Sequence, residues 1–351
     1  MNKKIMIVAG TRPEWIKLIS FINESEIAGF NVKLVNTGQH LDMSKEVLDM
    51  FGQIPDYELK IMEHKQSLTK IIKNVINKLT PIVEKEQPDY IVVLGDTNTG
   101  MGAGLVAFYN QIPLIHLEGG ARSYNKKDPF PEEMNRRLLD NIADYITCQT
   151  TLDQKLLEKE NIHNSVFVGN YSLDVLKRLT NKIRDDKKVL ITMHRREGWG
   201  DQQTEVCGAI KMLAEEFSEY TFVFPIHPNP SIQENVRKIL TGIDNVKLID
   251  ALRFDYFIDE LSTCSLVMTD SGGVLQEALF LKKPVIYLRD ICEYAKICDK
   301  KMIRVTGKHA YKIVEETSIL LSNKLPCVET TVFGDGNAGK KTVELVMGGL
   351  K

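Results

Sequence analysis

Polar residues gather directly after the predicted strands of this chain, where their side chains could act on a bound molecule. The clusters are Gly10–Glu14, Thr37–His40, Gly95–Thr97, Glu118–Gly120, His194–Glu197, His227 and Asp270–Gly273. In open α/β sheets, ligands bind beyond the carboxyl ends of the strands. The pattern therefore predicts that these clusters surround a ligand.

Three carboxylates are candidates for acid–base catalysis. Asp96 and Glu118 each end an apolar strand, so both are expected to be partly desolvated at the sheet edge. Glu132 stands at the start of a predicted helix, where its negative charge could instead interact favourably with the helix dipole. Glu133 fits that second role equally well.

A second group of residues is suited to a phosphorylated ligand. Ser271, Gly272 and Gly273 join a strand to a helix, where free N–H groups attract phosphate, and Glu277 lies one turn later, within reach of a ribose. A tight turn with an acidic residue near the helix start would also explain this sequence.

Basic residues follow the first strand of each half. Arg12 and Lys17 could clamp a diphosphate, although Thr11–Glu14 also has the spacing of a helix capping box. His194 and Arg196 follow a later strand, where neighbouring guanidinium groups favour a neutral imidazole. An exposed basic loop is the alternative interpretation of that segment.

Apolar strands alternate with helix-length segments along the chain, which is typical of parallel sheets covered on both faces. The predicted strands are Ile5–Ala9, Val32–Asn36, Tyr90–Leu94, Leu114–Leu117, Tyr145–Gln149, Val166–Gly169, Val189–Met193, Thr221–Pro225, Val246–Ile249, Leu266–Thr269 and Pro284–Leu288. The pattern predicts an α/β fold of two Rossmann-like domains with a cleft between them. We place the first at residues 1–170 with a tail at about 335–351, and the second at 171–334.

Composition narrows the class of protein. Hydrophobic residues make up 43% and charged residues 26% of the 351 residues, and the net charge is −2. This balance predicts a globular protein that binds neither nucleic acid nor membrane. The cysteines form no CxxC pair and the first apolar run is too short for a signal peptide, so we expect a reduced, cytoplasmic protein without structural zinc.

These motifs together resemble the UDP-N-acetylglucosamine 2-epimerase family, in its non-hydrolysing form. The matching segments begin with GTRPEWIKL at Gly10, TGQH at Thr37, GDTNT at Gly95, HLEGGARS at His116, PEEMNRR at Pro131, GNYSLDVL at Gly169, HRRE at His194, DSGG at Asp270, KPVIYLRD at Lys283 and FGDGNAGK at Phe333. Their order along the chain makes the resemblance specific.

The resemblance implies the glycosyltransferase-B-type fold and reversible conversion of UDP-GlcNAc to UDP-ManNAc. Anti elimination of UDP would give 2-acetamidoglucal, and UDP would add back with the opposite configuration at C2. The family's roles fall on these residues as follows: acid–base and catalytic groups at Asp96, Glu118, Glu132 and His194; UDP contacts at Arg12, Lys17, Arg196, Ser271, Gly272, Gly273 and Glu277; a possible allosteric site at Gln39 and His40. It further implies no metal or cofactor, a homodimer, and supply of a precursor for cell-surface polysaccharide.

Two departures from the family pattern concern the substrate. Tyr294 stands where an arginine is usual, and Lys296 where a glutamate is usual. They leave the exact sugar open, so a 2-epimerase for a modified UDP-sugar is one alternative. The others are a hydrolysing epimerase that releases UDP and ManNAc, against which the Gly10–Glu14 motif speaks, a retaining glycosyltransferase, and a non-catalytic nucleotide-sugar sensor.

Overall fold

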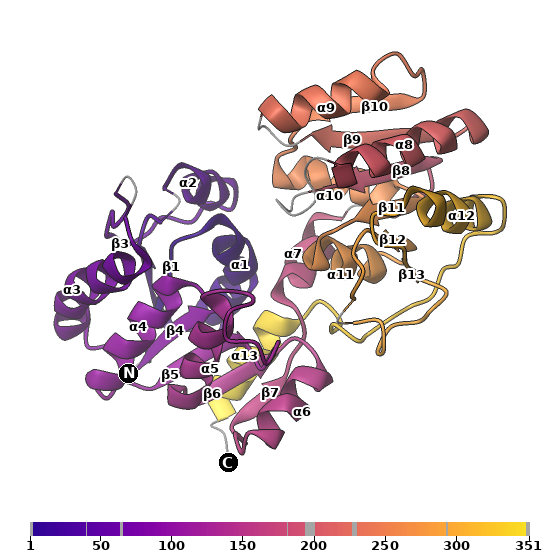
Figure 1. The fold of residues 1–351 in the computed structure, drawn as a ribbon. Coiled ribbons are helices and arrows are strands. Elements are labelled where there is room, and N and C mark those ends of the chain that lie inside the picture. Colours follow the sequence, from indigo (N-terminus) through magenta and orange to yellow (C-terminus); the bar gives the residue numbers. More distant parts are fainter. Residues whose placement is uncertain are drawn as a thin grey trace. The chain divides into compact units, whose positions relative to one another are not determined.

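A computed structural model describes residues 3–39, 41–63, 66–180, 182–193, 201–226, 230–292 and 294–348. The chain divides into two compact units, one of Met1–Val175 with Phe333–Lys351 and the other of Leu176–Val332. Each unit contains one parallel sheet with its own helices (Figure 1).

The first unit is built on a sheet of the order β3-β2-β1-β4-β5-β6-β7, in which neighbouring strands are parallel. Its strands are β1 (Lys4–Ala9), β2 (Asn31–Asn36), β3 (Tyr57–Glu58), β4 (Tyr90–Leu94), β5 (Leu114–Gly119), β6 (Tyr145–Cys148) and β7 (Ser165–Phe167). The helices that alternate with them are α1 (Arg12–Ile27), α2 (Leu41–Met50), α3 (Leu68–Glu86), α4 (Asn98–Tyr109), α5 (Glu132–Ile142) and α6 (Thr151–Lys159). Helix α7 (Tyr171–Leu179) contains the division between the two units, and α13 (Ala338–Gly348) belongs to the first.

The central strands form because their residues are apolar on both faces. Every residue of β4 is buried, as are the last five of β1, so helices must cover the sheet on both sides. The chain order reverses between β1 and β4, which is the point where doubly wound sheets bind their ligands.

The second unit repeats this plan with the order β10-β9-β8-β11-β12-β13. Its strands are β8 (Lys188–Thr192), β9 (Thr221–Ile226), β10 (Val246–Asp250), β11 (Leu266–Thr269), β12 (Val285–Tyr287) and β13 (Ile303–Val305). Its helices are α8 (Asp201–Glu216), α9 (Pro230–Leu240), α10 (Phe254–Thr263), α11 (Gly272–Phe280) and α12 (Ala310–Leu321). Here the order reverses between β8 and β11, and Asp270–Gly273 follows β11 directly.

The predicted fold class of two parallel sheets is confirmed, and each predicted strand is present within a few residues. The sequence failed to predict the edge strands β3 and β13. Both are short, and neighbouring strands hold them through bonds such as Val285 N–H to the Met302 carbonyl at 2.8 Å. Their extended conformation comes from tertiary pairing and leaves little trace in local sequence.

The chain returns to the first unit at its C-terminal end. Helix α13, drawn in yellow in Figure 1, packs on α1. Asp174 accepts hydrogen bonds from the N–H groups of Ala338 (2.9 Å) and Gly339 (2.8 Å) at the start of α13. Close to this point the backbones of Gly169 and Gly334 touch, since a Cβ on Gly169 would lie 2.8 Å from the Gly334 Cα.

Within the described part of the chain, no helix combines the length and the apolar character that crossing a membrane requires.

The Gly169→Ala substitution should destabilise the protein strongly. Gly169 has φ +106°, and the new Cβ would also meet the Phe333 carbonyl oxygen at 2.9 Å. We expect about 3 kcal/mol or more of lost unfolding free energy, measured by urea denaturation. Gly52→Ala is the control, because Gly52 has φ +68° with nothing within 4 Å, so it should cost only the backbone strain of about 1–2 kcal/mol. Equal losses in the two variants would contradict the importance of the Gly169–Gly334 contact.

Candidate functional site

The carboxyl ends of β1, β4 and β5 come together in the first unit through buried polar contacts. Glu14, in the first turn of α1, accepts hydrogen bonds from Thr11 N–H (2.8 Å) and Thr11 Oγ1 (2.7 Å), which forms the expected capping box. Its other oxygen accepts from Thr97 Oγ1 at 2.8 Å, just after β4. Burial raises the pKa of Glu14 above its ordinary value, and the hydrogen bonds from Thr11 and Thr97 oppose that shift.

The two basic residues of α1 differ in their surroundings. Lys17 Nζ lies 2.5 Å from Glu118 Oε2, so Lys17 is not the solvated surface charge that was one alternative. Arg12 begins α1 and is partly exposed, and its guanidinium makes no ion pair with any residue that the structure describes. Arg12 is therefore available to an anionic ligand.

Glu118 has two unusual features. Its φ of +63° places a non-glycine residue in the left-handed region, where backbone strain is expected. Its side chain is 6% exposed, and the buried Oε1 has no hydrogen-bond partner among the described residues. A buried carboxylate oxygen without a partner costs free energy, and a polar group of a ligand could offset that cost by binding it.

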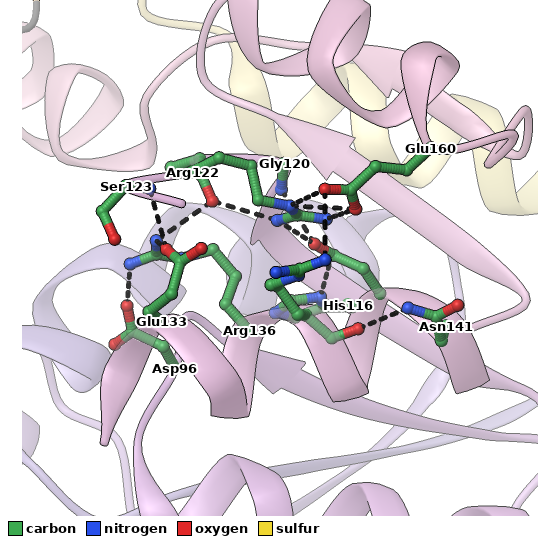
Figure 2. A network of polar contacts seen from close by, with 12 residues as sticks. Asp96, His116, Gly120, Arg122, Ser123, Glu133, Arg136, Asn141 and Glu160 are labelled. Atoms are coloured by element: carbon green, nitrogen blue, oxygen red, sulfur yellow. Dashed lines mark hydrogen bonds and ion pairs between the residues drawn. The ribbon is translucent and has the colours of Figure 1, made fainter. Parts of the chain in front are cut away.

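Asp96 follows β4 at nearly the same level of the sheet as Glu118 on β5. The Gly95 N–H donates to the Leu117 carbonyl at 2.8 Å, which fixes this register. Arg136 Nη2 pairs with Asp96 Oδ2 (Figure 2). Asn135 Nδ2 donates to the Asp96 carbonyl at 2.9 Å. The first turns of α5 therefore lie directly against Asp96.

The structure separates Glu132 from Glu133, which the sequence could not. Glu133 is fully buried and accepts hydrogen bonds from the N–H groups of Ser123 (2.9 Å) and Tyr124 (3.2 Å), so its role is to fix a loop. Glu132 is partly exposed at the start of α5, and its carboxylate makes no hydrogen bond or ion pair with the described residues. Glu132 is thus the acidic residue of the pair that is free to act on a ligand.

A buried polar network joins α5 to β5 and to the segment that follows β5 (Figure 2). His116 Nδ1 lies 2.8 Å from Asp140 Oδ1, and Arg122 Nη1 lies 2.7 Å from Asp140 Oδ2. Arg122 also donates to Glu160, from Nη2 to Oε2 at 2.9 Å and from Nε to both oxygens at 3.1 Å. Burial raises the pKa of Asp140, but the interactions of its carboxylate with His116 and with the Arg122 guanidinium outweigh burial and hold that pKa below its ordinary value.

In the second unit the candidate ligand site is the turn into α11. Ser271 is the N-cap residue, and its hydroxyl accepts from Val274 N–H at 3.4 Å. Asp270 is fully buried, and Thr269 Oγ1 accepts from Ser271 N–H at 3.0 Å. Glu277, also buried, lies in the second turn of the same helix.

Neither glycine of this turn is required by the protein's own packing. A Cβ on Gly272 would meet nothing closer than 3.9 Å, and one on Gly273 nothing closer than 3.8 Å. Their φ angles are outside the left-handed region, so other residues would also be tolerated there. The missing side chains instead leave the helix N-terminus open to a ligand. The nearest atoms to Gly272 include a ring carbon of Tyr294, so the departure seen in the sequence lies beside this turn.

Some predicted site residues cannot be placed. His40, His194 and Arg196 lie outside the described residues. Gln39 is described, and its Oε1 accepts from Thr99 Oγ1 at 3.1 Å.

The sequence did not predict the supporting roles of Asp140, Arg136 and Asn135. All three lie on α5, and the polar face of a helix gives no sign of which strand it will meet. In the described ranges no cluster of three or more His, Cys, Asp or Glu has the arrangement of a metal site.

The two Rossmann-like units, each with its site residues at the carboxyl ends of the strands, define a glycosyltransferase-B-like fold. The structure of the glycotransferase of kitacinnamycin has this fold, with a TM-score of 0.69, 12% identity, and coverage of 99% of each chain. At that identity the likeness concerns the fold alone.

Closer relatives identify the family. The model of the family described as UDP-N-acetylglucosamine 2-epimerase matches residues 23–347. The UDP-N-acetylglucosamine 2-epimerase of Salmonella borreze is 36% identical over 367 residues, covering 97% of each chain. The crystal structure of UDP-GlcNAc 2-epimerase from Neisseria meningitidis bound to UDP-GlcNAc is 31% identical, covers 99% of this chain and 100% of its own, and has a TM-score of 0.86. This chain therefore belongs to the UDP-N-acetylglucosamine 2-epimerase family, a family of isomerases.

The Asp140→Asn substitution should change how stability depends on pH. Because the Asp140 pKa is lower in the folded protein, the ionised group stabilises the fold above its unfolded pKa of about 3.9, and this contribution is lost as pH falls through the folded pKa. We expect the variant to lose about 3 kcal/mol at pH 7. The difference from the native protein should shrink between pH 5 and 3 in thermal melts. A difference that stays constant over this range would contradict the assignment.

Proposed function

We propose that this protein catalyses the reversible 2-epimerisation of UDP-GlcNAc to UDP-ManNAc by elimination and re-addition of UDP. Membership of the family supports the reaction. The observation that carries the mechanism is Glu118. Its backbone is strained, its buried Oε1 has no hydrogen-bond partner among the described residues, and it ends β5 next to β4, the strand that Asp96 follows. Carboxylates held near a substrate carbon can remove and return a proton.

In the proposed elimination, a base takes the C2 proton, the C1–O bond breaks, and its electron pair leaves with the UDP phosphate. The product is 2-acetamidoglucal. In the reverse direction, UDP adds back at C1 and an acid returns the proton to C2. Epimerisation requires that this proton arrive on the other face, so more than one acid–base group is needed. We assign Asp96, Glu118 and Glu132 to these transfers, and the Lys17 ammonium group lies 2.5 Å from Glu118 Oε2.

We assign UDP binding to the turn into α11. Cleavage of the C1–O bond places negative charge on the diphosphate, and N–H groups at a helix start stabilise such charge. The open approach to Gly272 and Gly273 supports this assignment, and buried Glu277 is our candidate for the ribose. Arg12, with no ion-pair partner among the described residues, is the proposed clamp on the diphosphate. His194 and Arg196 remain candidates from the sequence.

The resemblance also implies a homodimer and a part in supplying precursor for cell-surface polysaccharide. Both stay predictions.

The proposed reaction can be tested by incubating the protein with UDP-GlcNAc in D2O and following proton NMR. Because the C2 proton is removed and returned, we expect deuterium at C2 and the appearance of UDP-ManNAc. Stoichiometric free UDP and ManNAc would indicate the hydrolysing reaction instead. Absence of exchange would contradict the proposal and favour a modified sugar, which the position of Tyr294 beside Gly272 makes the first alternative to try.

The substitutions Asp96→Asn and Glu118→Gln should each lower the rate of C2 exchange at least about 10²-fold, since each removes an acid–base group. UDP affinity, measured by calorimetry, should change little. Asp89→Asn is the matched control, because Asp89 precedes β4 at the opposite end from Asp96, where it accepts from Lys4 N–H. Full exchange activity in both test variants would refute the carboxylate assignment.

The Gly273→Ala substitution should weaken UDP binding while stabilising the fold. The methyl group would obstruct approach to the helix N-terminus, so we expect about tenfold weaker UDP binding, or about 1.4 kcal/mol. Alanine should stabilise α11 by about 0.5–1 kcal/mol. Gly208→Ala on α8, where a Cβ would have nothing within 4 Å, should give a similar stabilisation with unchanged UDP binding. Unaltered UDP affinity in Gly273→Ala would argue against phosphate at this turn.

A further inference from the structure

The two backbone segments that carry Asp96 and Glu118 are joined beneath the sheet edge by one side chain. His116 is fully buried in β5, two residues before Glu118. Its Nε2 lies 2.6 Å from the Gly95 carbonyl oxygen, directly before Asp96. Its Nδ1 lies 2.8 Å from Asp140 Oδ1. Both partners are acceptors, so both contacts are hydrogen bonds when each ring nitrogen carries a hydrogen.

Asp140, the partner of His116, holds the segment that follows Glu118. Asp140 Oδ2 accepts from Gly120 N–H at 3.3 Å. Gly119 packs so closely that a Cβ there would lie 2.4 Å from Asp140 Oδ1 and 3.2 Å from His116 Nδ1. The backbone on which Glu118 adopts its left-handed conformation therefore rests directly on the His116–Asp140 pair.

The pair is itself held rigidly. Arg122 bridges Asp140 and Glu160, and the Asp140 and Arg122 side chains are both fully buried. Arg122 Nη1 also donates to the Ala121 carbonyl at 3.0 Å. A buried ionic network of this kind has few alternative arrangements, because moving any member would leave a buried charge unpaired.

From this geometry we propose that His116 is a positioning residue, which sets the separation of the Asp96 and Glu118 carboxylates by holding Gly95 on one side and, through Asp140, Gly120 on the other. The inference rests on the proposed function of those two carboxylates. His116 is fully buried and its ring nitrogens are engaged with protein groups, so it acts through the backbone. Displacement of a catalytic group by about 1 Å can cost about 10²-fold in rate.

The two bonds of His116 can be removed separately. In His116→Gln the side-chain amide can replace Nε2 and keep the bond to Gly95, while the bond to Asp140 is lost. In His116→Asn the amide can replace Nδ1 and keep the bond to Asp140, while the bond to Gly95 is lost. His116→Ala removes both.

We expect kcat for C2 exchange to fall about 10²-fold in His116→Ala and about tenfold in each amide variant, with KM and UDP affinity nearly unchanged. Crystal structures of the two amide variants should show which carboxylate each lost hydrogen bond positions. Asp96 should be displaced by about 0.5 Å or more in His116→Asn, and Glu118 in His116→Gln. If His116→Ala does not fold, His116→Gln and His116→Asn are sufficient for the test.

Asp144→Asn is the matched control. Asp144 Oδ2 accepts from Leu114 N–H at 2.8 Å, at the opposite end of β5 from the site. This variant should lose stability without loss of kcat. If the His116 variants likewise lose only stability, or raise KM at unchanged kcat, His116 is merely structural and the inference is wrong.

Measuring C2 exchange in the native protein distinguishes failure of this inference from failure of the proposed function. Absence of exchange in the native protein would contradict the proposed function, and the crystal structures would then decide about His116 alone. Exchange in the native protein together with full kcat in both amide variants would overturn only the inference. Unmoved carboxylates in those variants would overturn it in either case.

Discussion

Burial of the Asp140 carboxylate is the constraint on which the first unit's candidate site depends. An isolated buried charge costs several kcal/mol, so each of its oxygens must be engaged by donors. His116 engages Oδ1, while Arg122 and the Gly120 N–H engage Oδ2. These donors belong to β5 and the segment after it, whereas Asp140 belongs to α5. The hydrogen bonds that stabilise the Asp140 charge therefore hold α5 against the carboxyl end of β5, where Glu118 lies.

Much of the fold could be predicted from local sequence, because the central strands are buried on both faces. The residues of β4 are apolar without interruption, and this signal requires no knowledge of neighbouring elements. The polar clusters could be predicted for the same reason, since Asp96 and Ser271 interrupt apolar runs where strands end. Within each sheet, the gathering of such residues at one edge follows from parallel topology alone.

The contacts that give each site residue its character could not be predicted in this way. Lys17 and Glu118 are 101 positions apart, and nothing in α1 indicates that its lysine will meet β5. Glu132 and Glu133 are chemically identical neighbours, yet only Glu133 is turned inward onto the Ser123–Tyr124 loop. Burial and long-range pairing decide these roles, and both are properties of the folded chain.

The return of the chain to the first unit has a consequence for biosynthesis. Helix α13 covers α1, and Asp174 binds the start of α13, so the first unit includes residues that follow the second unit in the chain. At ribosomal rates of about 5–20 residues per second, roughly 8–35 seconds pass between synthesis of Asp174 and of α13. Throughout that interval the nascent first unit exposes the apolar surface that α13 will cover. Chaperone demand should therefore be greatest while the second unit is being translated.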